Sequence, residues 1–292
     1  GRRGGPRRSA GALVDRLRKR YPRRMRHDPA LLRDALAVAH RAADAAARVH
    51  RGHAGATLDI STKSSAIDLV TEVDRLSEAA IRAEIVAAFP DHAVLGEEQG
   101  QGAGDARFRW IVDPLDGTVN YAHGVPFYCV SVALEADGEV VAGVVLDTSR
   151  DERFAAVLGG GATRNGAPIE VSRAAAIGEA MLATGFAYGG DLVRRNLEVF
   201  ARIVPMARAV RRPGAAALDL CYVACGRFDG FWEYALNAWD VAAGLLITRE
   251  AGGTVTGAGG APYAWNDELM VASNGHLHAR LLALVAPGTT WA

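Results

Sequence analysis

Residues 110–121, WIVDPLDGTVNY, hold an apolar run that leads into two acidic residues in a tight turn. The first residues suit a buried strand, and a proline and a glycine then break it. Asp113 and Asp116 carry like charges, which repel by about 1 kcal/mol in water at a separation of about 4 Å and by more in a drier site. A strand that ends in this way predicts that something positive lies between the two carboxylates.

The charge of the 292-residue chain is divided unevenly between its first residues and the rest. Residues 1–24 contain ten Lys or Arg and one acidic residue, which leaves 23 basic and 32 acidic residues in the remainder, a formal net charge of −9. An acidic body favours small cations as partners. The basic arm (residues 1–24) fits either a disordered leader or a tether for nucleic acid or a membrane surface, and Met25 is a candidate start.

The length and composition of residues 25–292 predict one large domain, with two packed lobes at about 25–150 and 151–292. Half of the residues are hydrophobic, which is ample for a sizeable core. The three cysteines form neither a disulfide framework nor a paired metal motif. No apolar run has the length of a membrane span, and no signal-peptide pattern leads the chain. We therefore expect a cytoplasmic protein with no membrane contact.

Helical and strand patterns are interleaved along the chain. The spacing of apolar residues predicts helices over 29–51, 74–89, 191–209, 214–226 and 239–253, and a last helix after residue 274. Strand patterns cover 93–98, 109–114, 127–147, 227–234 and 268–272, with hairpin turns at 137–138 and 165–166. The polar segment 62–74 predicts a loop that ends where Asp74 can cap a helix. This order predicts a layered α/β or α+β fold.

Further acidic residues stand at the ends of these elements. Asp74 and Asp240 lie at helix starts, and Glu97 and Glu98 follow a strand. Each of them alone also fits an ordinary helix cap or a solvated turn. Together with the two aspartates of the opening stretch, they supply the converging carboxylates that Mg²⁺ binds in proteins. The set therefore indicates a magnesium site.

Gly117 and Thr118 follow the second aspartate and suit a phosphate group. A glycine lets the backbone approach closely, and its N–H groups can point at anionic oxygens. The Thr118 hydroxyl, together with Asp74, can orient and deprotonate a water beside the ions. The same turn thus predicts a phosphate cradle next to the cations.

Four blocks of the chain resemble the signature blocks of the inositol monophosphatase family. They are DLVTEVD at 68–74, GEE at 96–98, WIVDPLDGTVNY at 110–121 and WDVAAG at 239–244, in the family's order and with similar spacing. The likeness extends from about Asp28 to the C-terminus. It implies a five-layer αβαβα sandwich of the inositol monophosphatase and fructose bisphosphatase type, a homodimer, and Mg²⁺-dependent hydrolysis of phosphate monoesters.

The resemblance also implies a set of metal ligands. Glu97, Asp113 and the carbonyl of Leu115 would hold a first Mg²⁺, while Asp113, Asp116 and Asp240 would hold a second. A third, weaker ion would lie near Glu97. Li⁺ would inhibit by replacing Mg²⁺ at the weaker site.

Catalytic and substrate roles follow from the same resemblance. Asp74 and Thr118, with Glu97, would position the attacking water, and the N–H groups of Gly117 and Thr118 would bind phosphate oxygens. Lys63 would approach the site from its loop. Glu233, in the strand at 227–234, could also be an ordinary surface residue. The residues expected to meet the substrate's alcohol are Gly214, Ala215, Ala216, Glu233 and Asp240.

The resemblance leaves the substrate open. Inositol monophosphate is the expected ester, but relatives with these metal blocks act on fructose bisphosphate, histidinol phosphate or the 3′-phosphate of adenosine bisphosphates. A function of another class is a regulatory module that binds RNA or a transcription partner, as some bacterial members that resemble this chain do. The basic arm is the only sequence feature that favours this second function, whereas the intact ligand set favours catalysis.

Overall fold

The first layer of the protein consists of two helices, α2 (Pro29–His53) and α3 (Glu72–Ala88). The structure is a computed structural model that describes residues 27–56, 60–62, 69–187 and 189–286. The Asp28 side chain accepts a hydrogen bond from the Ala30 amide and Pro29 opens α2, so the predicted start is confirmed. In the described part of the chain, no helix is both long and apolar enough to cross a membrane.

The start of α3 differs from the expectation that Asp74 caps it. Thr71 is the capping residue, because its side chain accepts a hydrogen bond from the Val73 amide at 3.1 Å. Asp74 lies three residues later and accepts from the Thr71 amide at 2.7 Å, which completes a capping box. The helix therefore begins two residues before the predicted position.

The predicted loop over residues 62–74 is wrong at its end. Strand β2 (Leu69–Thr71) pairs in antiparallel fashion with β1 (Ile60–Thr62) and runs directly into α3. The β-branched residues of this stretch suit the pairing, although no alternation of polar and apolar residues announces it. Lys63 lies outside the described residues.

An eight-stranded sheet forms the second layer. All neighbouring strands are antiparallel except β3 and β5, which are parallel. The predicted hairpin turns are confirmed: the first and second residues of each turn have positive φ, 50° and 80° at 137–138 and 49° and 76° at 165–166. The spatial order is β10 (Ala167–Pro168), β9 (Gly161–Arg164), β8 (Glu152–Val157), β7 (Glu139–Asp147), β6 (Cys129–Ala136), β5 (Asp105–Asp116), β3 (His92–Gly96) and β4 (Gly100–Gln101).

A five-stranded sheet forms the fourth layer. Strand β11 is parallel to β12 and β13, and β15 is antiparallel to β13 and β14. The spatial order is β12 (Ala209–Arg211), β11 (Met181–Thr184), β13 (Gly230–Tyr234), β15 (Leu269–Ser273) and β14 (Thr254–Gly257).

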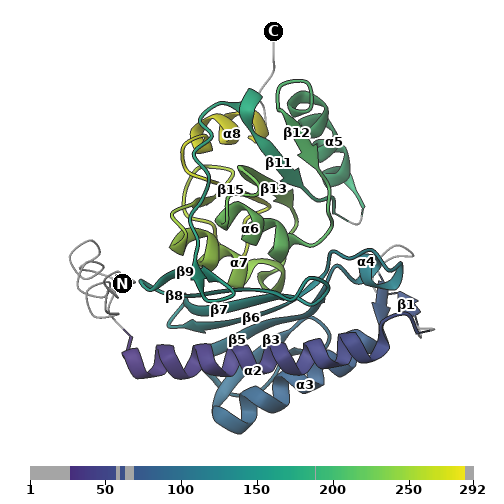
Figure 1. The fold of residues 1–292 in the computed structure, drawn as a ribbon, viewed down its shortest axis with the longest axis vertical. Helices are drawn as coiled ribbons and strands as arrows, with labels where there is room; N and C mark the ends of the chain where they lie inside the picture. Colours follow the sequence, from purple (N-terminus) through teal and green to yellow (C-terminus); the bar gives the residue numbers. More distant parts are fainter. Residues whose placement is uncertain (1–26, 57–59, 63–68, 188, 287–292) are drawn as a thin grey trace, which may run out of the picture.

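Helices fill the space between the two sheets and cover the outer face of the five-stranded sheet (Figure 1). The helices α6 (Ala216–Ala224) and α7 (Ala238–Glu250) lie between the sheets, and α5 (Asp191–Ile203) and α8 (His278–Val285) pack on the far side. Two short helices, α4 (Thr118–Ala122) and the 3₁₀ turn η1 (Ile177–Glu179), connect strands. The result is the layered fold that the residue patterns predicted, in the five-layer αβαβα form that the family resemblance implied.

The helix predicted over 191–209 is too long. It ends at Ile203, and residues 209–211 form strand β12 instead. Pro205 explains the early end, because a proline has no amide hydrogen to continue the helical bonding pattern, although Val204 before it still has helical angles. Strand β14 was also not expected, since its four residues offer too short a pattern.

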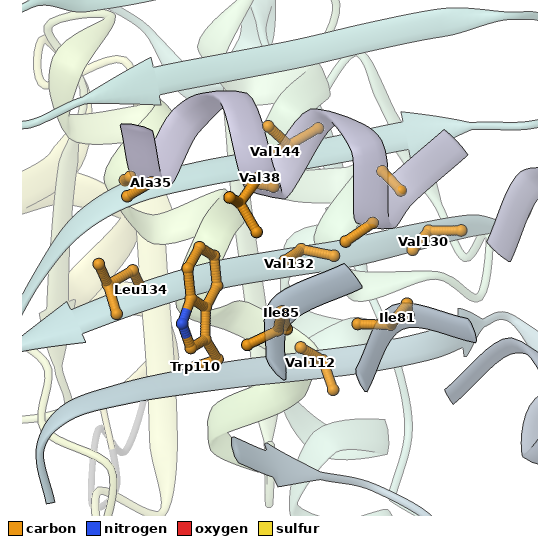
Figure 2. Packing of buried hydrophobic residues seen from close by; sticks show 14 of the residues in the cluster. Ala35, Val38, Ile81, Ile85, Trp110, Val112, Val130, Val132, Leu134 and Val144 are labelled. Carbon is orange, nitrogen blue, oxygen red and sulfur yellow. The ribbon is translucent and has the colours of Figure 1, made fainter. Parts of the chain in front are cut away.

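The strand that leads to the acidic turn is held by side chains on both of its faces. Trp110 and Val112 of β5 are fully buried against α2 and α3, together with Ile85 (Figure 2). Ile111, between them in the sequence, points to the opposite face and packs with residues of α6 and α7. Burial of a large apolar side chain contributes about 1.5–3 kcal/mol. The end of β5 is therefore rigidly placed.

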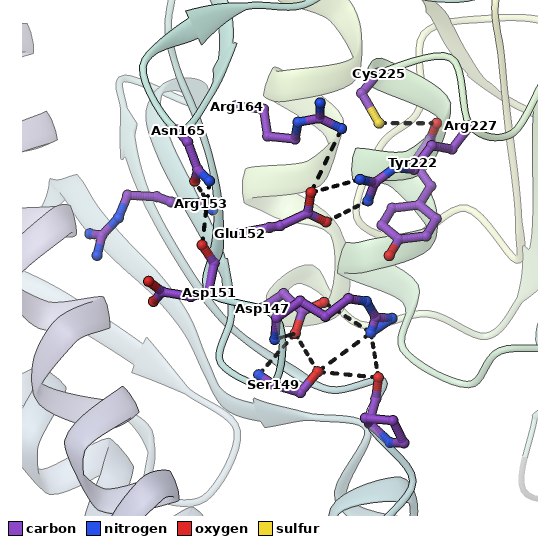
Figure 3. A network of polar contacts seen from close by, with 12 residues as sticks. Asp147, Ser149, Asp151, Glu152, Arg153, Arg164, Asn165, Tyr222, Cys225 and Arg227 are labelled. Carbon is purple, nitrogen blue, oxygen red and sulfur yellow. Dashed lines mark hydrogen bonds and ion pairs between the residues drawn. The ribbon is translucent and has the colours of Figure 1, made fainter.

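An ion-pair network joins the eight-stranded sheet to the segment after α6 (Figure 3). Glu152 on β8 accepts hydrogen bonds from both terminal nitrogens of Arg227, one of them at 2.6 Å, and Arg164 lies 3.7 Å away. These bonds hold the pKa of Glu152 below its usual range. The Arg227 guanidinium also stacks over the Tyr222 ring at 4.6 Å. The network thus ties α6 to the first sheet.

We expect the substitution Gly143→Val to destabilise the protein, because α7 packs directly on Gly143 of β7. A Cβ atom at this glycine would lie 3.0 Å from the Cα of Ala243. Overpacking of this kind costs about 1–3 kcal/mol of the free energy of unfolding, measured by urea denaturation. Gly52→Ala is the control, since no described residue lies within 4 Å of its added Cβ, and it should stabilise α2 by about 0.5–1 kcal/mol. An unchanged stability of Gly143→Val would contradict this packing.

Candidate active site

A cleft of about 330 Å³ opens where the end of β5 meets the starts of α6 and α7. Every predicted metal ligand and substrate contact lines it, while Asp74 lies behind it and Lys63 lies outside the described residues. The lining residues are Glu97, Asp113, Leu115 to Thr118, Gly185 to Ala187, Arg212, Gly214 to Ala216, Glu233 to Asn237, Trp239 and Asp240.

The turn at the end of β5 presents Asp113 to the cleft. The pairing of β5 with β6 shifts between Asp113 and Asp116, so the strand is irregular at this point. Such bulges re-aim side chains, often next to active sites. One oxygen of the Asp113 carboxylate accepts a hydrogen bond from the Leu115 amide at 3.0 Å. Asp113 is thereby fixed although it is almost fully buried.

Asp116 connects the two halves of the cleft. Its Oδ2 atom accepts a hydrogen bond from the Ala217 amide at 2.8 Å, and the Cys129 thiol lies 3.6 Å from the same oxygen. Ala217 is the second residue of α6, so the carboxylate meets an amide without a partner inside its helix, at the positive end of the helix dipole. This contact places α6 against the acidic turn.

Asp240 is fixed at the start of α7. Its Oδ2 atom accepts from the Asn237 amide at 2.7 Å in a capping box. As with Asp74, the capping residue is therefore three residues earlier than expected, at Asn237, and α7 begins at Ala238. Asp240 also lines the cleft. A single carboxylate therefore serves both the helix and the site.

The turn that carries Glu97 depends on two residues that sequence reasoning missed. Glu78 of α3 is fully buried, accepts from the Glu98 amide at 2.7 Å and pairs with Arg82 at 2.8 Å. A Cβ atom at Gly96 would lie 2.3 Å from Glu78 Oε1, so a larger residue would displace the Glu78 carboxylate. Glu78 and Arg82 are four residues apart on a helix, which is the pattern of an ordinary surface ion pair, and this hid their role.

The carboxylates of the cleft disturb one another. Burial, followed by the charges of Glu97, Asp116 and Asp240, raises the pKa of Asp113 well above its usual range. Burial and the charge of Asp240 raise the pKa of Asp116 to about 8, against the lowering effect of its bond to the Ala217 amide. Four acidic side chains that oppose each other's ionisation form a donor set that a hard divalent cation relieves.

The carboxylates fit a cation but do not stand in a finished ligand shell. Within residues 27–56, 60–62, 69–187 and 189–286, no group of three His, Cys, Asp or Glu side chains is arranged closely enough to hold an ion as it stands. A cation bound here would therefore draw the side chains together or use other oxygens of the cleft, such as the Leu115 carbonyl. Mg²⁺ also keeps several waters as ligands, so it does not need a complete protein shell.

Asp74 acts on the cleft through Thr118. The Thr118 hydroxyl lies 2.9 Å from Asp74 Oδ1 and 3.0 Å from the Leu115 carbonyl oxygen, and its one hydrogen can be donated to either. The other oxygen of Asp74 is held by the amide and hydroxyl of Thr71, at 2.7 and 2.6 Å. The pair is thus rigid and combines a hydroxyl with a buried carboxylate that can accept a proton.

The wall opposite the acidic turn carries Glu233, at the end of β13. Burial, followed by the charges of Asp240 and Asp116, raises the pKa of Glu233 to about 8, and the nearby Arg212 acts in the other direction. A Cβ atom at Gly185 would lie 2.1 Å from Glu233 Oε1. The glycine at the end of β11 therefore makes the space in which the carboxylate lies, and nothing in the sequence marks it.

Two further residues near this wall were not expected. Asp219 of α6 is buried, and its Oδ1 atom has no hydrogen-bond partner among the residues that the structure describes. Burial and the charge of Glu233 raise the pKa of Asp219 well above the usual range. The position of Asp219 within the apolar run of α6 could have indicated a buried acidic residue. Ala235 lines the cleft with φ of 59°, a left-handed conformation that costs a residue other than glycine about 1–2 kcal/mol.

Comparison with known proteins agrees with this geometry. The sequence profile of the Inositol monophosphatase family matches residues 31–289. The chain belongs to the inositol monophosphatase family. Membership of the inositol monophosphatase family implies a phosphatase, in agreement with the acidic cleft.

Individual members of the inositol monophosphatase family carry two kinds of name. An inositol-1-monophosphatase of Synechocystis sp. is 44% identical over 241 residues, covering 81% of this chain and 83% of that protein. A Nus factor SuhB of Pseudomonas aeruginosa is 42% identical over 231 residues, covering 77% and 85%. The crystal structure of the extragenic suppressor protein suhB from Bartonella henselae superposes with a TM-score of 0.83 at 39% identity, covering 87% and 98%.

We expect the metal-free protein to lose stability as the pH rises from about 4 to about 8. The pKa of Asp116 is about 8 in the folded chain and close to 3.9 in an unfolded one, so over this range only the folded chain binds the proton. Asp116→Asn keeps an acceptor for the Ala217 amide and removes the charge. In EDTA at pH 8 its melting temperature should exceed that of the wild type by at least about 3 °C.

The control for this prediction is Asp151→Asn, on an exposed turn away from the cleft. This variant should follow the pH dependence of the wild type in a thermal melt. If Asp116→Asn followed it too, the carboxylates of the cleft would not oppose one another as described.

Proposed function

We propose that this chain is a Mg²⁺-dependent phosphatase of small polyol monoesters, with inositol monophosphate as its leading substrate. The observation that carries the proposal is one cleft in which Glu97, Asp113, Asp116 and Asp240 lie beside a glycine and a threonine that suit a phosphate. Family membership supports the reaction, and the name of the Synechocystis relative supports the substrate.

Two to three ions are expected in the cleft once its ligands are drawn together. Glu97, Asp113 and the Leu115 carbonyl would hold one, and Asp113, Asp116 and Asp240 a second, with a weaker site near Glu97 at which Li⁺ competes. When bound, Mg²⁺ lowers the pKa of a water and offsets the negative charge of the phosphate. Asp116 would use one oxygen for the ion, because the other is engaged by the Ala217 amide.

Residues of the acidic turn would place the reacting groups. The Thr118 hydroxyl would accept a hydrogen bond from the attacking water and donate its own hydrogen to Asp74, which takes up one proton as the hydroxyl receives one from the water. The amides of Gly117 and Thr118 bind the phosphate oxygens, since the first amides of α4 have no partner inside their helix. Chemistry of this kind requires positioning and charge stabilisation rather than a covalent intermediate.

The opposite wall would bind the alcohol. The Glu233 carboxylate can accept hydrogen bonds from two neighbouring hydroxyls, which is a feature of polyols. Arg212 favours the ionised form of Glu233, because its positive charge lowers the pKa of that carboxyl. The backbone at Gly214 to Ala216 lies in the same cleft and completes this side.

A second candidate function is binding of RNA or of a transcription partner. The observation in its favour is the name Nus factor SuhB carried by the Pseudomonas aeruginosa relative. The basic arm, which suggested this function, lies outside the described residues. Removal of residues 1–24 should abolish salt-dependent RNA binding if the arm is the binding element.

The homodimer expected from the family resemblance stays a prediction.

We expect Asp116→Asn to lower phosphate release at least about a hundredfold in the presence of Mg²⁺, because one ligand of the second ion loses its charge. Phosphate release should be measured with inositol monophosphate, fructose bisphosphate, histidinol phosphate and adenosine 3′,5′-bisphosphate. Asp151→Asn should retain wild-type turnover. Full activity of Asp116→Asn would refute the metal assignment, and a preference for another ester would refute only the substrate.

We expect Gly185→Ala to raise the KM for a polyol ester about tenfold, because the added Cβ displaces the Glu233 carboxylate. Steady-state kinetics on the wild type and the variant provide the measurement. Gly259→Ala is the control, since nothing lies within 4 Å of its added Cβ and it does not line the cleft. A KM within twofold of the wild type would mean that Glu233 does not meet the alcohol.

A further inference from the structure

Asn120 lies in α4, two residues after Thr118, and its side chain bridges two separate segments of the cleft wall. Its Nδ2 group donates to the Phe127 carbonyl at 2.7 Å and to the Pro213 carbonyl at 2.9 Å. An amide nitrogen carries two hydrogens, and here each meets one acceptor. The bonds therefore also fix the orientation of the amide, with its nitrogen toward the two carbonyls.

One end of this bridge is firmly anchored. The Phe127 ring packs edge-on against Tyr222 with 5.6 Å between ring centroids, and the Arg150 guanidinium lies 5.2 Å from the centre of the same ring. Arg150 also donates to the Pro126 carbonyl and pairs with Asp147, the buried aspartate of the network in Figure 3. The Phe127 carbonyl is thus a fixed point.

The other end of the bridge leads straight into the alcohol side of the cleft. Pro213 is followed by the 214–216 segment, whose last residue is the first of α6. A Cβ atom at Gly117 would lie 2.9 Å from the Phe127 carbonyl oxygen and 3.3 Å from that of Gly214. The phosphate turn and the 214–216 segment therefore touch through their backbones, and small displacements of one would be felt by the other.

We propose that Asn120 is a positioning residue that fixes the 214–216 segment against the phosphate turn at Gly117 and Thr118. It acts through the Pro213 carbonyl and does not itself line the cleft. The inference rests on the proposed function, because it assigns the two segments to the two ends of one substrate. When a protein positions both ends of a substrate, a displacement of one group by about 1 Å lowers the reaction rate strongly.

The chemistry of the amide makes the proposal specific. Asn120→Ala removes both donors, while Asn120→Asp keeps the shape and turns an oxygen toward two carbonyl oxygens. The aspartate should therefore be the more damaging change. If the side chain served only to fill space, Asn120→Asp would resemble the wild type and Asn120→Ala would be worse.

The matched control is Asn274→Asp. The Asn274 side chain likewise joins distant segments, donating to the Ala174 carbonyl at 2.8 Å and to the Ser172 hydroxyl at 2.9 Å, but it does not line the cleft. It reports what the loss of an equivalent bridge does to stability alone. All variants are assayed well below their melting temperatures.

The test is steady-state kinetics of the full chain with Mg²⁺, combined with inhibition by inorganic phosphate. For the best ester of the wild type, kcat/KM should fall at least about tenfold in Asn120→Ala and about a hundredfold in Asn120→Asp, while the inhibition constant of phosphate stays within about threefold. Asn274→Asp should retain both values. An Asn120→Asp enzyme within threefold of the wild type, or an equal loss of ester turnover and phosphate affinity, would overturn the proposal.

Hydrogen exchange separates this proposal from the proposed function. Amides of residues 214–220 should exchange faster in Asn120→Ala than in the wild type and in Asn274→Asp, with or without a substrate. If the wild type released phosphate from no ester, the proposed function would fail while faster exchange would still support the bridge. Unchanged exchange in Asn120→Ala would reject the bridge even in an active phosphatase.

Discussion

The hydrogen bond from the Ala217 amide to the Asp116 carboxylate joins two layers of the protein. It links the acidic turn of the eight-stranded sheet to α6, which lies between the two sheets. The residues lie 101 positions apart in the chain. Asp116 ends β5, and Ala217 belongs to the first turn of α6, so the cleft exists only where these two elements meet. The bond uses a carboxyl group as a helix cap, and the ionised form of this group is stable only if the rest of its charge is also compensated.

The acidic residues of the cleft follow one rule of construction. Each aspartate of the site accepts a hydrogen bond from a backbone amide at a helix start or turn: Asp74, Asp113, Asp116 and Asp240. Glu78 accepts in the same way from the turn that contains Glu97. Backbone amides thereby hold mutually repelling carboxylates close to one another. A cation then needs only to draw together groups that are already anchored on rigid elements.

Local patterns predicted most helices, several strands and the acidic end of the cleft: apolar periodicity, turn residues such as Asp137-Gly138, and acidic residues at element ends. The five-layer arrangement followed from the resemblance to a known family. The sequence did not reveal Glu78, which resembles a surface ion pair with Arg82, or Gly185, whose importance depends on its distance to Glu233. The function of Asn120 depends on a carbonyl 93 residues away. Contacts between distant segments have no signature in a single sequence, so the substrate side remained the least predictable.

The edges of the eight-stranded sheet bear on how copies of the chain can associate. Its outermost strands, β10 and β4, have two residues each, and β10 ends in a proline that cannot donate to a neighbouring strand. Unpaired backbone on a long, flat edge is the usual template for aggregation and strand exchange. Edges this short offer no such template, so an oligomer that used this lobe would have to be built from side-chain surfaces rather than from a continuous intermolecular sheet.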